Sequence, residues 1–310
     1  MLRRHFNAAL CSMAWAPFAQ ARTQRGPLFW LATRGRSRVF LVSFAEARAG
    51  DESWFTPALR RAFDDSVELW LEVAPAEALV WRDPATRVKE DAEYQTLSRE
   101  PPGRTFFDEL EPHARERARA YVAELAIKKE LLEPLRPWAA YYTINAAYWA
   151  RTQLPYEPVN VDHVLWKRAT EAGKSVGYEM PTGVAFARFM AAMPQKAQSQ
   201  YIEFLLNYFD DRKKGLAGDV FDWQVGSPTG SVRNLDRMRQ ALPALYQCMQ
   251  VQRNIGWAHR IDALLDTHRT CYIAIGQLHV LGPDGIPAQL RRLRIVRTAD
   301  LQENPAYPRE

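Results

Sequence analysis

The sequence predicts an α/β fold in which strands from both ends of the chain form one mixed β-sheet around a large helical insert. Apolar runs of strand length lie within 28–44, at 67–73 and at 272–276, near the two ends. Apolar residues at helical spacing fill roughly 104–265. The chain has 310 residues and is 47% hydrophobic, which is enough for a sizeable core. We therefore expect a single domain over 22–310 with a helical subdomain at roughly 104–265.

The N-terminal third predicts a hairpin, a helix and a strand. Residues 28–32 and 39–44 flank a polar turn at 33–37, which is typical of a β-hairpin. Thr56 and Pro57 form an N-cap followed by proline in the first turn, so we expect a helix to residue 63. A strand follows at 67–73, and strand, helix and strand at this spacing favour an α/β sheet. The polar segment 84–103 is expected to be a loop.

The middle of the chain predicts helices, and strands return toward the end. Helices are expected at 106–110, 115–132, 137–151, 161–172 and 185–209, the last interrupted near Pro194. Gly173 ends one of them, and 174–179 is expected to be a strand. After a charged turn at 210–218, a helix at 254–265 should bury Trp257, Ala258, Ile261, Leu264 and Leu265. Strands are expected at 272–276 and 293–296.

Charge and missing motifs exclude several classes of function. The net charge is +5, and basic and acidic residues are interspersed, so we expect a solvated surface and no nucleic-acid partner. No apolar run reaches the ~18 residues that span a bilayer. The sequence has no Gly-x-x-x-x-Gly-Lys loop, His-Glu-x-x-His helix, Gly-x-Ser-x-Gly elbow or Cys-x-x-Cys pair. Nucleotide chemistry, zincin proteolysis and serine hydrolysis are therefore unsupported.

The N-terminus predicts a signal peptide over residues 1–21. Basic residues Arg3 and Arg4 precede a mostly apolar stretch at 8–18, and Ala19-Gln20-Ala21 fits a cleavage site. We expect a periplasmic or secreted protein; the alternative is a frayed N-terminal helix. After cleavage only Cys248 and Cys271 would remain, either as a disulfide or as two separate buried thiols.

One motif near the C-terminus points to chemistry. The apolar run at 272–276 continues as Gly276-Gln277-Leu278-His279 and is followed by Gly282. This pattern places His279 just beyond the C-terminal end of a strand, where open α/β sheets have their sites. A histidine there can bind a metal or transfer a proton near neutral pH. The alternative is a hydrogen-bonded histidine at the start of a loop.

Several short segments, in this order and spacing, resemble the TraB/GumN family, which is related to the Tiki membrane metalloproteases. The resemblance covers most of the chain after residue 26. It rests on Pro27-Leu28-Phe29-Trp30, Leu69-Trp70-Leu71-Glu72, Gly177-Tyr178-Glu179, Arg253-Asn254 and Gly276-Gln277-Leu278-His279. It implies a metal-dependent hydrolase of peptide or amide bonds, with a peptide or protein substrate and a divalent metal such as Mn, Co or Zn.

The first Gly-x-x-His motif of that family is altered in this chain. Ser43-Phe44-Ala45-Glu46 stands where the family has glycine and histidine. The resemblance then makes Glu46 and His279 the metal ligands, and a carboxylate ligand favours harder metals such as Mn²⁺. The alternative is that Glu46 is a solvated loop charge.

Three further residues complete the expected site. Glu72 would be a ligand or general base, Glu179 a base or a partner of a ligand, and Arg253 a group that stabilises an oxyanion or holds a carboxylate. The alternatives are that Glu72 forms a structural ion pair with Arg253 and that Glu179 and Asp162 are structural. Two functions remain open: a metal-dependent hydrolase, favoured by the retained second motif, and a degenerate member that binds a peptide or protein without turnover, favoured by the altered first motif.

Overall fold

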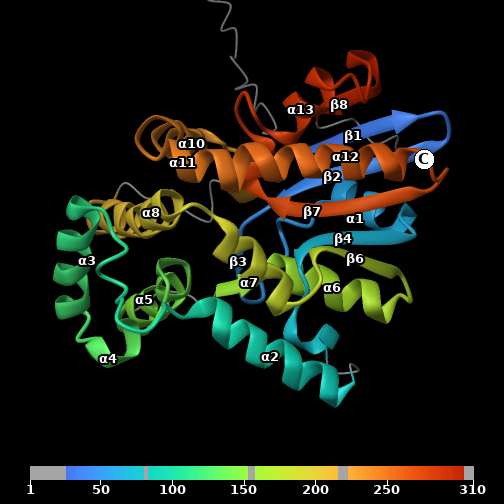
Figure 1. Ribbon diagram of the computed structural model, residues 1–310. Coiled ribbons are helices and arrows are strands. Elements are labelled where there is room, and N and C mark those ends of the chain that lie inside the picture. The colour runs from blue at the N-terminus through green and yellow to red at the C-terminus, as the bar shows by residue number, and fades with distance from the viewer. Residues whose placement is uncertain (1–25, 80–82, 153–157, 216–222, 304–310) are drawn as a thin grey trace, which may run out of the picture.

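A six-stranded mixed sheet forms the centre of the molecule (Figure 1). The computed structural model describes residues 26–79, 83–152, 158–215 and 223–303. The predicted signal peptide lies outside these ranges. The strand order is β6-β4-β7-β2-β1-β8. The strands are β1 (Phe29–Arg34), β2 (Ser37–Phe44), β4 (Glu68–Val73), β6 (Ser175–Met180), β7 (Thr270–Gly276) and β8 (Leu301–Glu303).

The strands from the two ends of the chain are neighbours, as predicted. β7 lies between β2 and β4 and is parallel to both, and β6 is parallel to β4. β1 forms the predicted hairpin with β2, and both β1 pairings, with β2 and with β8, are antiparallel. A separate two-stranded sheet pairs β3 (Glu46–Arg48) with β5 (Pro158–Asn160). The four parallel strands all end at the same edge of the main sheet.

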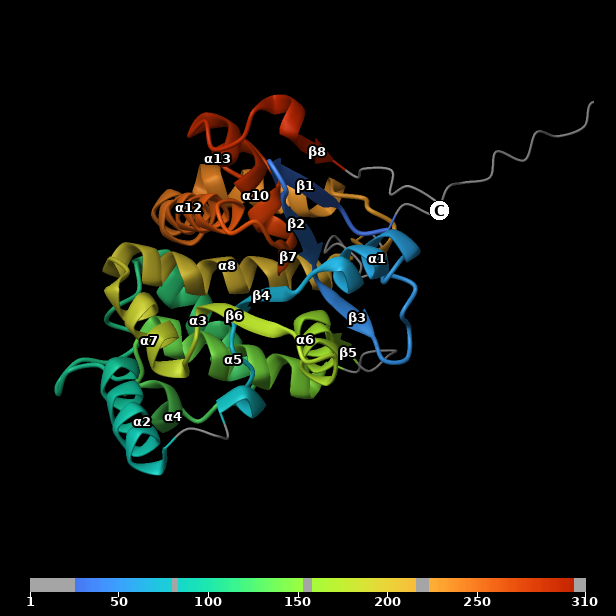
Figure 2. The same ribbon diagram turned by 90° about the vertical axis from the view of Figure 1, so that its right-hand side faces the viewer.

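Two hydrophobic layers cover the two faces of the sheet. In β7, Cys271, Ile273 and Ile275 pack toward α12 (Arg253–Leu265), and the alternate residues Tyr272 and Ala274 pack on the other face. That second face is covered by α1 (Pro57–Asp65) and α6 (Val161–Glu171), which Figure 2 shows across the sheet from α12. The predicted inner face of α12, from Trp257 to Leu265, is buried. Both layers come from the alternation of side chains along a strand.

The predicted helical insert packs beside the sheet, at the left of Figure 1. A third hydrophobic cluster joins α3 (Pro112–Glu124), α5 (Pro137–Arg151) and α8 (Gln195–Lys213) through Val122, Ile144 and Phe209. The insert also contains α4 (Lys129–Leu132), α7 (Gly183–Ala192), α10 (Thr229–Ala241) and α11 (Pro243–Tyr246), and α2 (Pro84–Ser98) precedes it in the sequence. The interruption predicted near Pro194 separates α7 from α8.

The prediction of a loop at 84–103 is wrong for 84–98, which form α2. Asp83 caps this helix by accepting a hydrogen bond from Thr86 N at 2.8 Å, and Pro84 occupies its first turn. Ser98 is the one fully buried residue of this helix, and the half-buried Tyr94 and Leu97 pack against the core from the same face. The N-cap Asp83 and the proline that follows it therefore indicate this helix better than the spacing of its apolar residues does.

Four other segments differ from the predictions. Residues 106–110 form turns, although Phe106 and Leu110 are buried as a helical face would be. The helix expected at 115–132 breaks between α3 and α4, where Ala126 has a positive φ. Residues 293–296 form a turn with Arg294 at positive φ, and the last strand is instead β8. The α8 helix continues to Lys213, through the first part of the charged turn expected at 210–218.

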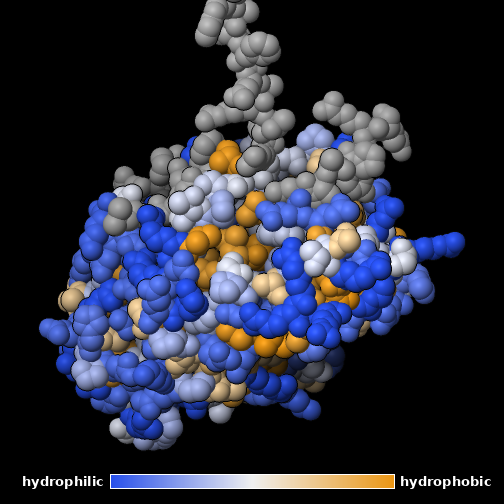
Figure 3. Space-filling model, turned by 90° about the horizontal axis from the view of Figure 1, so that it is seen from above, coloured by the Kyte–Doolittle hydropathy of each residue, from blue (hydrophilic) through white to orange (hydrophobic). Residues whose placement is uncertain are grey.

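Three further features concern the surface, the helices and the two cysteines. On the face seen from above in Figure 1, hydrophobic side chains gather near the middle and hydrophilic ones surround them (Figure 3). None of the helices in the described ranges combines the length and apolarity that crossing a bilayer requires. Cys248 and Cys271 are both buried free thiols. The structure therefore agrees with the separate-thiol alternative.

Candidate functional site

The parallel strands bring the predicted polar residues to one edge of the sheet. Glu72 stands next to the end of β4, Glu179 next to the end of β6, and His279 three residues after β7. Open parallel sheets bind ligands at this carboxyl edge. The helix α12 adds Arg253 at its first position.

Arg253 is the centre of the cluster. Its Nη2 donates to Glu72 Oε2 at 2.6 Å and to Glu179 Oε2 at 2.5 Å, and its Nε donates to Glu179 Oε1 at 2.9 Å. Its Nη1 lies 3.0 Å from His279 Nε2. The Arg253 residue is only 9% exposed. The alternative of an ion pair between Glu72 and Arg253 is therefore present in the structure.

The partners of His279 define its tautomer. Because a guanidinium can only donate, His279 Nε2 accepts from Arg253 Nη1. The other ring nitrogen, Nδ1, then carries the proton and donates to Asn254 Oδ1 at 2.7 Å. Asn254 Nδ2 donates to the Asp284 carbonyl at 2.8 Å, which fixes the orientation of the Asn254 amide. Both ring nitrogens of His279 are thus hydrogen-bonded within the protein.

Burial and the guanidinium fix the charge states of the cluster. Burial acts to raise the pKa of Glu72, but Arg253, His279 and the Gly276 N–H outweigh it and hold the pKa at about 2. Burial and Arg253 lower the pKa of His279 to about 4 against the attraction of Glu72. Burial opposes the charge of Arg253, but Glu72 and Glu179 raise its pKa well above the usual value. At neutral pH Glu72 is therefore ionised, His279 is neutral and Arg253 is charged.

Local backbone structure positions these groups. A π-helical turn (Gln247–Gln252) connects α11 to α12 directly before Arg253 and Asn254. Such turns are frequent at functional sites because they shift the side chains that follow. Gly276 N donates to Glu72 Oε1 at 2.6 Å, and a Cβ at Gly276 would lie 3.1 Å from that oxygen. Glycine at this position therefore permits the close approach of the Glu72 carboxylate.

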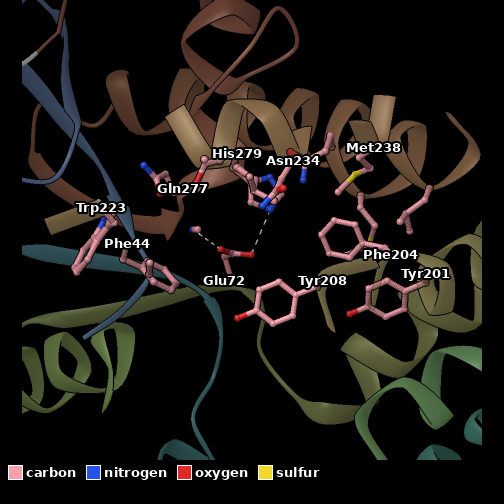
Figure 4. A pocket seen from close by; sticks show the side chains of 18 of the residues that line it. Phe44, Glu72, Tyr201, Phe204, Tyr208, Trp223, Asn234, Met238, Gln277 and His279 are labelled. Carbon is pink, nitrogen blue, oxygen red and sulfur yellow. Dashed lines mark hydrogen bonds and ion pairs between the residues drawn. The ribbon is translucent and has the colours of Figure 1, made fainter. Parts of the chain in front are cut away.

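A pocket of about 530 Å³ lies beside the cluster, and Glu72 and His279 form part of its lining (Figure 4). Glu72 points into it between Phe44 on one side and Tyr208 on the other. Aromatic rings form much of the wall, with amides and hydroxyls between them. The aromatic lining residues are Phe44, Tyr141, Trp149, Tyr201, Phe204, Tyr208 and Trp223, and the amide-bearing ones are Asn145, Asn234, Gln250 and Gln277.

The altered first motif has a clear place in the fold. Ser43 is buried in β2, where its Oγ donates to the Leu28 carbonyl at 2.8 Å. The backbone of Glu46 starts β3 and pairs with Asn160, two residues before Asp162. The Glu46 side chain lies outside the described part of the structure. Burial, together with nearby Glu72, raises the pKa of Asp162, whose Oδ1 accepts from the His163 backbone N at 2.8 Å.

The metal ligands implied by the family resemblance are only partly available. His279 Nε2 faces Arg253, and each Glu72 oxygen already accepts a hydrogen bond. Over the ranges that the structure describes, no group of three His, Cys, Asp or Glu side chains is placed to hold a metal ion. A metal at His279 would therefore have to displace Arg253. A role for Glu46 as ligand stays a prediction.

The sequence identified the polar cluster, and the structure adds residues that it did not single out. Glu72, Glu179, Arg253 and His279 lie together in the structure. Unexpected partners are Asn254, which orients His279, and Trp257, whose Nε1 donates to Glu179 Oε2 at 3.0 Å. The aromatic wall was also missed, because its residues come from β2 and several helices of the insert and follow no common spacing.

A comparison with protein families identifies this chain. The model of the TraB/PrgY/gumN family matches residues 28–295. This range includes the complete polar cluster and every described strand apart from β8. No curated protein and no solved structure matches the chain. The chain therefore belongs to the TraB/PrgY/gumN family.

Proposed function

We propose that this protein binds a peptide or protein segment in the pocket above Glu72 and does not hydrolyse it with a metal. The observation that carries the proposal is the position of the Arg253 guanidinium. It lies at the centre of Glu72, Glu179 and His279, where it occupies the Nε2 lone pair of the expected metal ligand His279, and a pocket of ligand size opens beside the cluster.

The first argument concerns the cation. A divalent metal beside Glu72 and His279 would stand next to the positive charge of Arg253, which is held by two carboxylates and is buried. Breaking such a buried pair leaves uncompensated charge and costs about 3–5 kcal/mol. Metal binding would have to supply that free energy in addition to dehydrating the ion.

The second argument concerns proton transfer. A general base works best when its pKa lies near the pH at which it acts. The pKa of Glu72 is about 2 and that of His279 about 4, and the His279 lone pair already accepts from Arg253. Neither group is therefore prepared to activate water at neutral pH.

The third argument concerns the pocket. Its volume of about 530 Å³ falls within the ~300–1,000 Å³ of ligand sites. The aromatic walls can pack on apolar side chains, and Asn145, Asn234 and Gln277 can pair with backbone N–H and C=O groups. This combination suits a peptide. The predicted signal peptide supports action in the periplasm or outside the cell, and N-terminal sequencing of the protein from its host tests that part.

A library of synthetic hexapeptides tests the proposal. Immobilised protein is incubated with the library in Mn²⁺ or in chelator, and mass spectrometry measures which peptides are retained and which are cleaved. We expect retention of intact peptides in both conditions. Ser227→Trp places a large ring in the pocket and should abolish retention, whereas Thr229→Trp changes an exposed residue nearby and should not. Metal-dependent cleavage, or no retention by the wild type, overturns the proposal.

Calorimetric titration tests the metal question separately. Mn²⁺, Co²⁺ and Zn²⁺ are titrated into the wild type, Glu46→His and His279→Ala. We expect no binding that depends on His279 in the wild type. Glu46→His supplies the imidazole that the first motif lacks, and stronger Co²⁺ or Zn²⁺ binding by that variant would support the predicted position of Glu46. If the wild type binds one of these metals and His279→Ala does not, the proposal that the site works without a metal is contradicted.

A further inference from the structure

We propose that the group entering the pocket beside Glu72 is an ammonium group, from either the amino terminus or a lysine side chain of the bound peptide. The inference rests on the proposed function and names the chemistry that the pocket selects. Three features of the described residues carry it: the charge of the cluster, the free acceptors and the aromatic wall.

The first feature is an uncompensated negative charge. Glu72 and Glu179 contribute two negative charges and Arg253 one positive charge. The His279 ring is neutral because its Nε2 accepts from Arg253 Nη1, so the cluster carries one net negative charge. Of these groups, the negative Glu72 lines the pocket and Arg253 does not. No lysine or arginine is among the pocket-lining residues within the described ranges. An anion would therefore be repelled by the net negative charge of the cluster, whereas an ammonium would neutralise it.

The second feature is unused hydrogen-bond acceptor capacity. Each Glu72 oxygen accepts one hydrogen bond, from Gly276 N or from Arg253 Nη2, and a carboxylate oxygen can accept a second. The Glu72 side chain is 17% exposed, so the pocket reaches it. An ammonium has three donors and no acceptor, which matches the two Glu72 oxygens.

The third feature is the arrangement of aromatic rings. Phe44 and Tyr208 lie on the two sides of Glu72 in Figure 4, with Phe204 and Tyr201 beyond Tyr208. Ring faces attract cations, and the attraction grows when both groups are shielded from water. The Arg212 guanidinium already lies 4.8 Å from the ring centroid of Trp149 and 6.0 Å from that of Tyr208. The part of the pocket that favours a new cation is therefore the part beside Glu72 and Phe44.

A series of small probes of equal size tests the charge preference. Hexylamine, hexanol and hexanoate are titrated at pH 7, and binding is followed by tryptophan fluorescence, because Trp149 and Trp223 line the pocket. We expect hexylamine to bind at least about tenfold more tightly than hexanol, and hexanoate not to bind. Equal binding of the amine and the alcohol, or binding of the carboxylate, overturns the inference.

A pH series repeats the test without changing the protein. The α-amino group of phenylalanine amide loses its charge near pH 8, whereas its N-trimethyl derivative stays charged. Over the pH range of about 6.5–9, the Glu72 carboxylate is held by Arg253 and the His279 Nε2 lone pair accepts from the same guanidinium, while burial raises the pKa values of Tyr141 and Tyr201 above their usual range. We expect the amide to lose affinity as pH rises and the trimethyl derivative to keep it. Parallel behaviour of the two probes overturns the inference.

Matched variants assign the effect to Glu72. Glu72→Gln removes the charge and should weaken hexylamine binding at least about tenfold. Glu68→Gln removes a carboxylate from the opposite end of the same strand, beside Cys271, and should leave the affinity unchanged. If Glu72→Gln does not fold, the pH series decides.

Peptide variants distinguish the two sources of the ammonium and separate this inference from the proposed function. For a retained hexapeptide, acetylation removes the terminal charge and norleucine replaces lysine. A large loss of affinity in one arm identifies the source. Unchanged affinity when both charges are removed overturns the ammonium inference and leaves peptide binding intact. Binding of hexylamine with no retained peptide overturns the proposed function and leaves the charge preference intact.

Discussion

Protonation of His279 should make the folded state unstable in acid. Burial and Arg253 lower its pKa from 6.5 to about 4, so the unfolded chain binds a proton at a higher pH than the folded protein does. Stability then decreases as pH falls from about 6.5 to about 4. Each pKa unit corresponds to about 1.4 kcal/mol, which predicts a loss of about 2.5 kcal/mol between pH 7.5 and pH 4.5 from this residue.

Urea denaturation at the two pH values, followed by tryptophan fluorescence, measures this loss. Other carboxylates also titrate near pH 4.5, so the comparison with His279→Gln is decisive. Glutamine cannot gain the proton, and the variant should show a pH-dependent loss smaller by about 2.5 kcal/mol. His259→Gln changes an exposed histidine on α12 and should behave like the wild type. If His279→Gln keeps the full pH dependence, the assigned environment of His279 is wrong.

Three further predictions concern stability and can be checked by the same denaturation assay at neutral pH. Arg253→Met leaves Glu72 and Glu179 buried without their cation and should lower the free energy of unfolding by about 3–5 kcal/mol. Part of this loss should be recovered at lower pH as a carboxyl group takes up a proton, and an unchanged denaturation midpoint would contradict the prediction. Gly177→Ala places a Cβ 2.5 Å from the Trp70 ring and should cost about 1–3 kcal/mol, whereas Gly256→Ala in α12 meets open space and should gain up to about 1 kcal/mol. Ile261→Ala in the buried face of α12 should cost about 2–5 kcal/mol, and a value near zero would show that the helix does not pack on the sheet as described.

The sheet could be predicted because its strands carry their own signals. The apolar runs that became β2, β4 and β7 are short and bounded by turn residues, and parallel strands buried on both faces have this pattern. The errors occurred where apolar spacing was weak or local geometry decided. α2 begins at its cap and its proline, and it packs through Tyr94, whose ring centroid lies 5.8 Å from that of Trp138. A spacing argument cannot detect such a helix.

The cluster could be predicted for a related reason, and the pocket could not. Polar residues at the ends of parallel strands meet at one edge whatever the connections are, so the proximity of Glu72 and His279 followed from their positions. Glu179 and Arg253 were singled out by the family resemblance. The wall of the pocket depends on how α5, α8 and α10 pack against that edge. Tyr201 and Tyr208 on α8 look like core residues in the sequence, and only the packing of the insert turns them toward Glu72.

The position of Arg253 connects the altered motif to the chemistry of the pocket. A site that holds a metal needs donors whose lone pairs are free, but here the guanidinium takes those of His279 and part of those of Glu72 and Glu179. Two carboxylates against one guanidinium leave a negative charge that a buried site does not retain without a partner nearby. The charge reaches the pocket through Glu72, where a ligand cation can approach it and where Gly276 keeps the carboxylate oriented. In our proposal, the arrangement that disfavours a metal at His279 is thus the same one that gives the pocket a preference for an ammonium group.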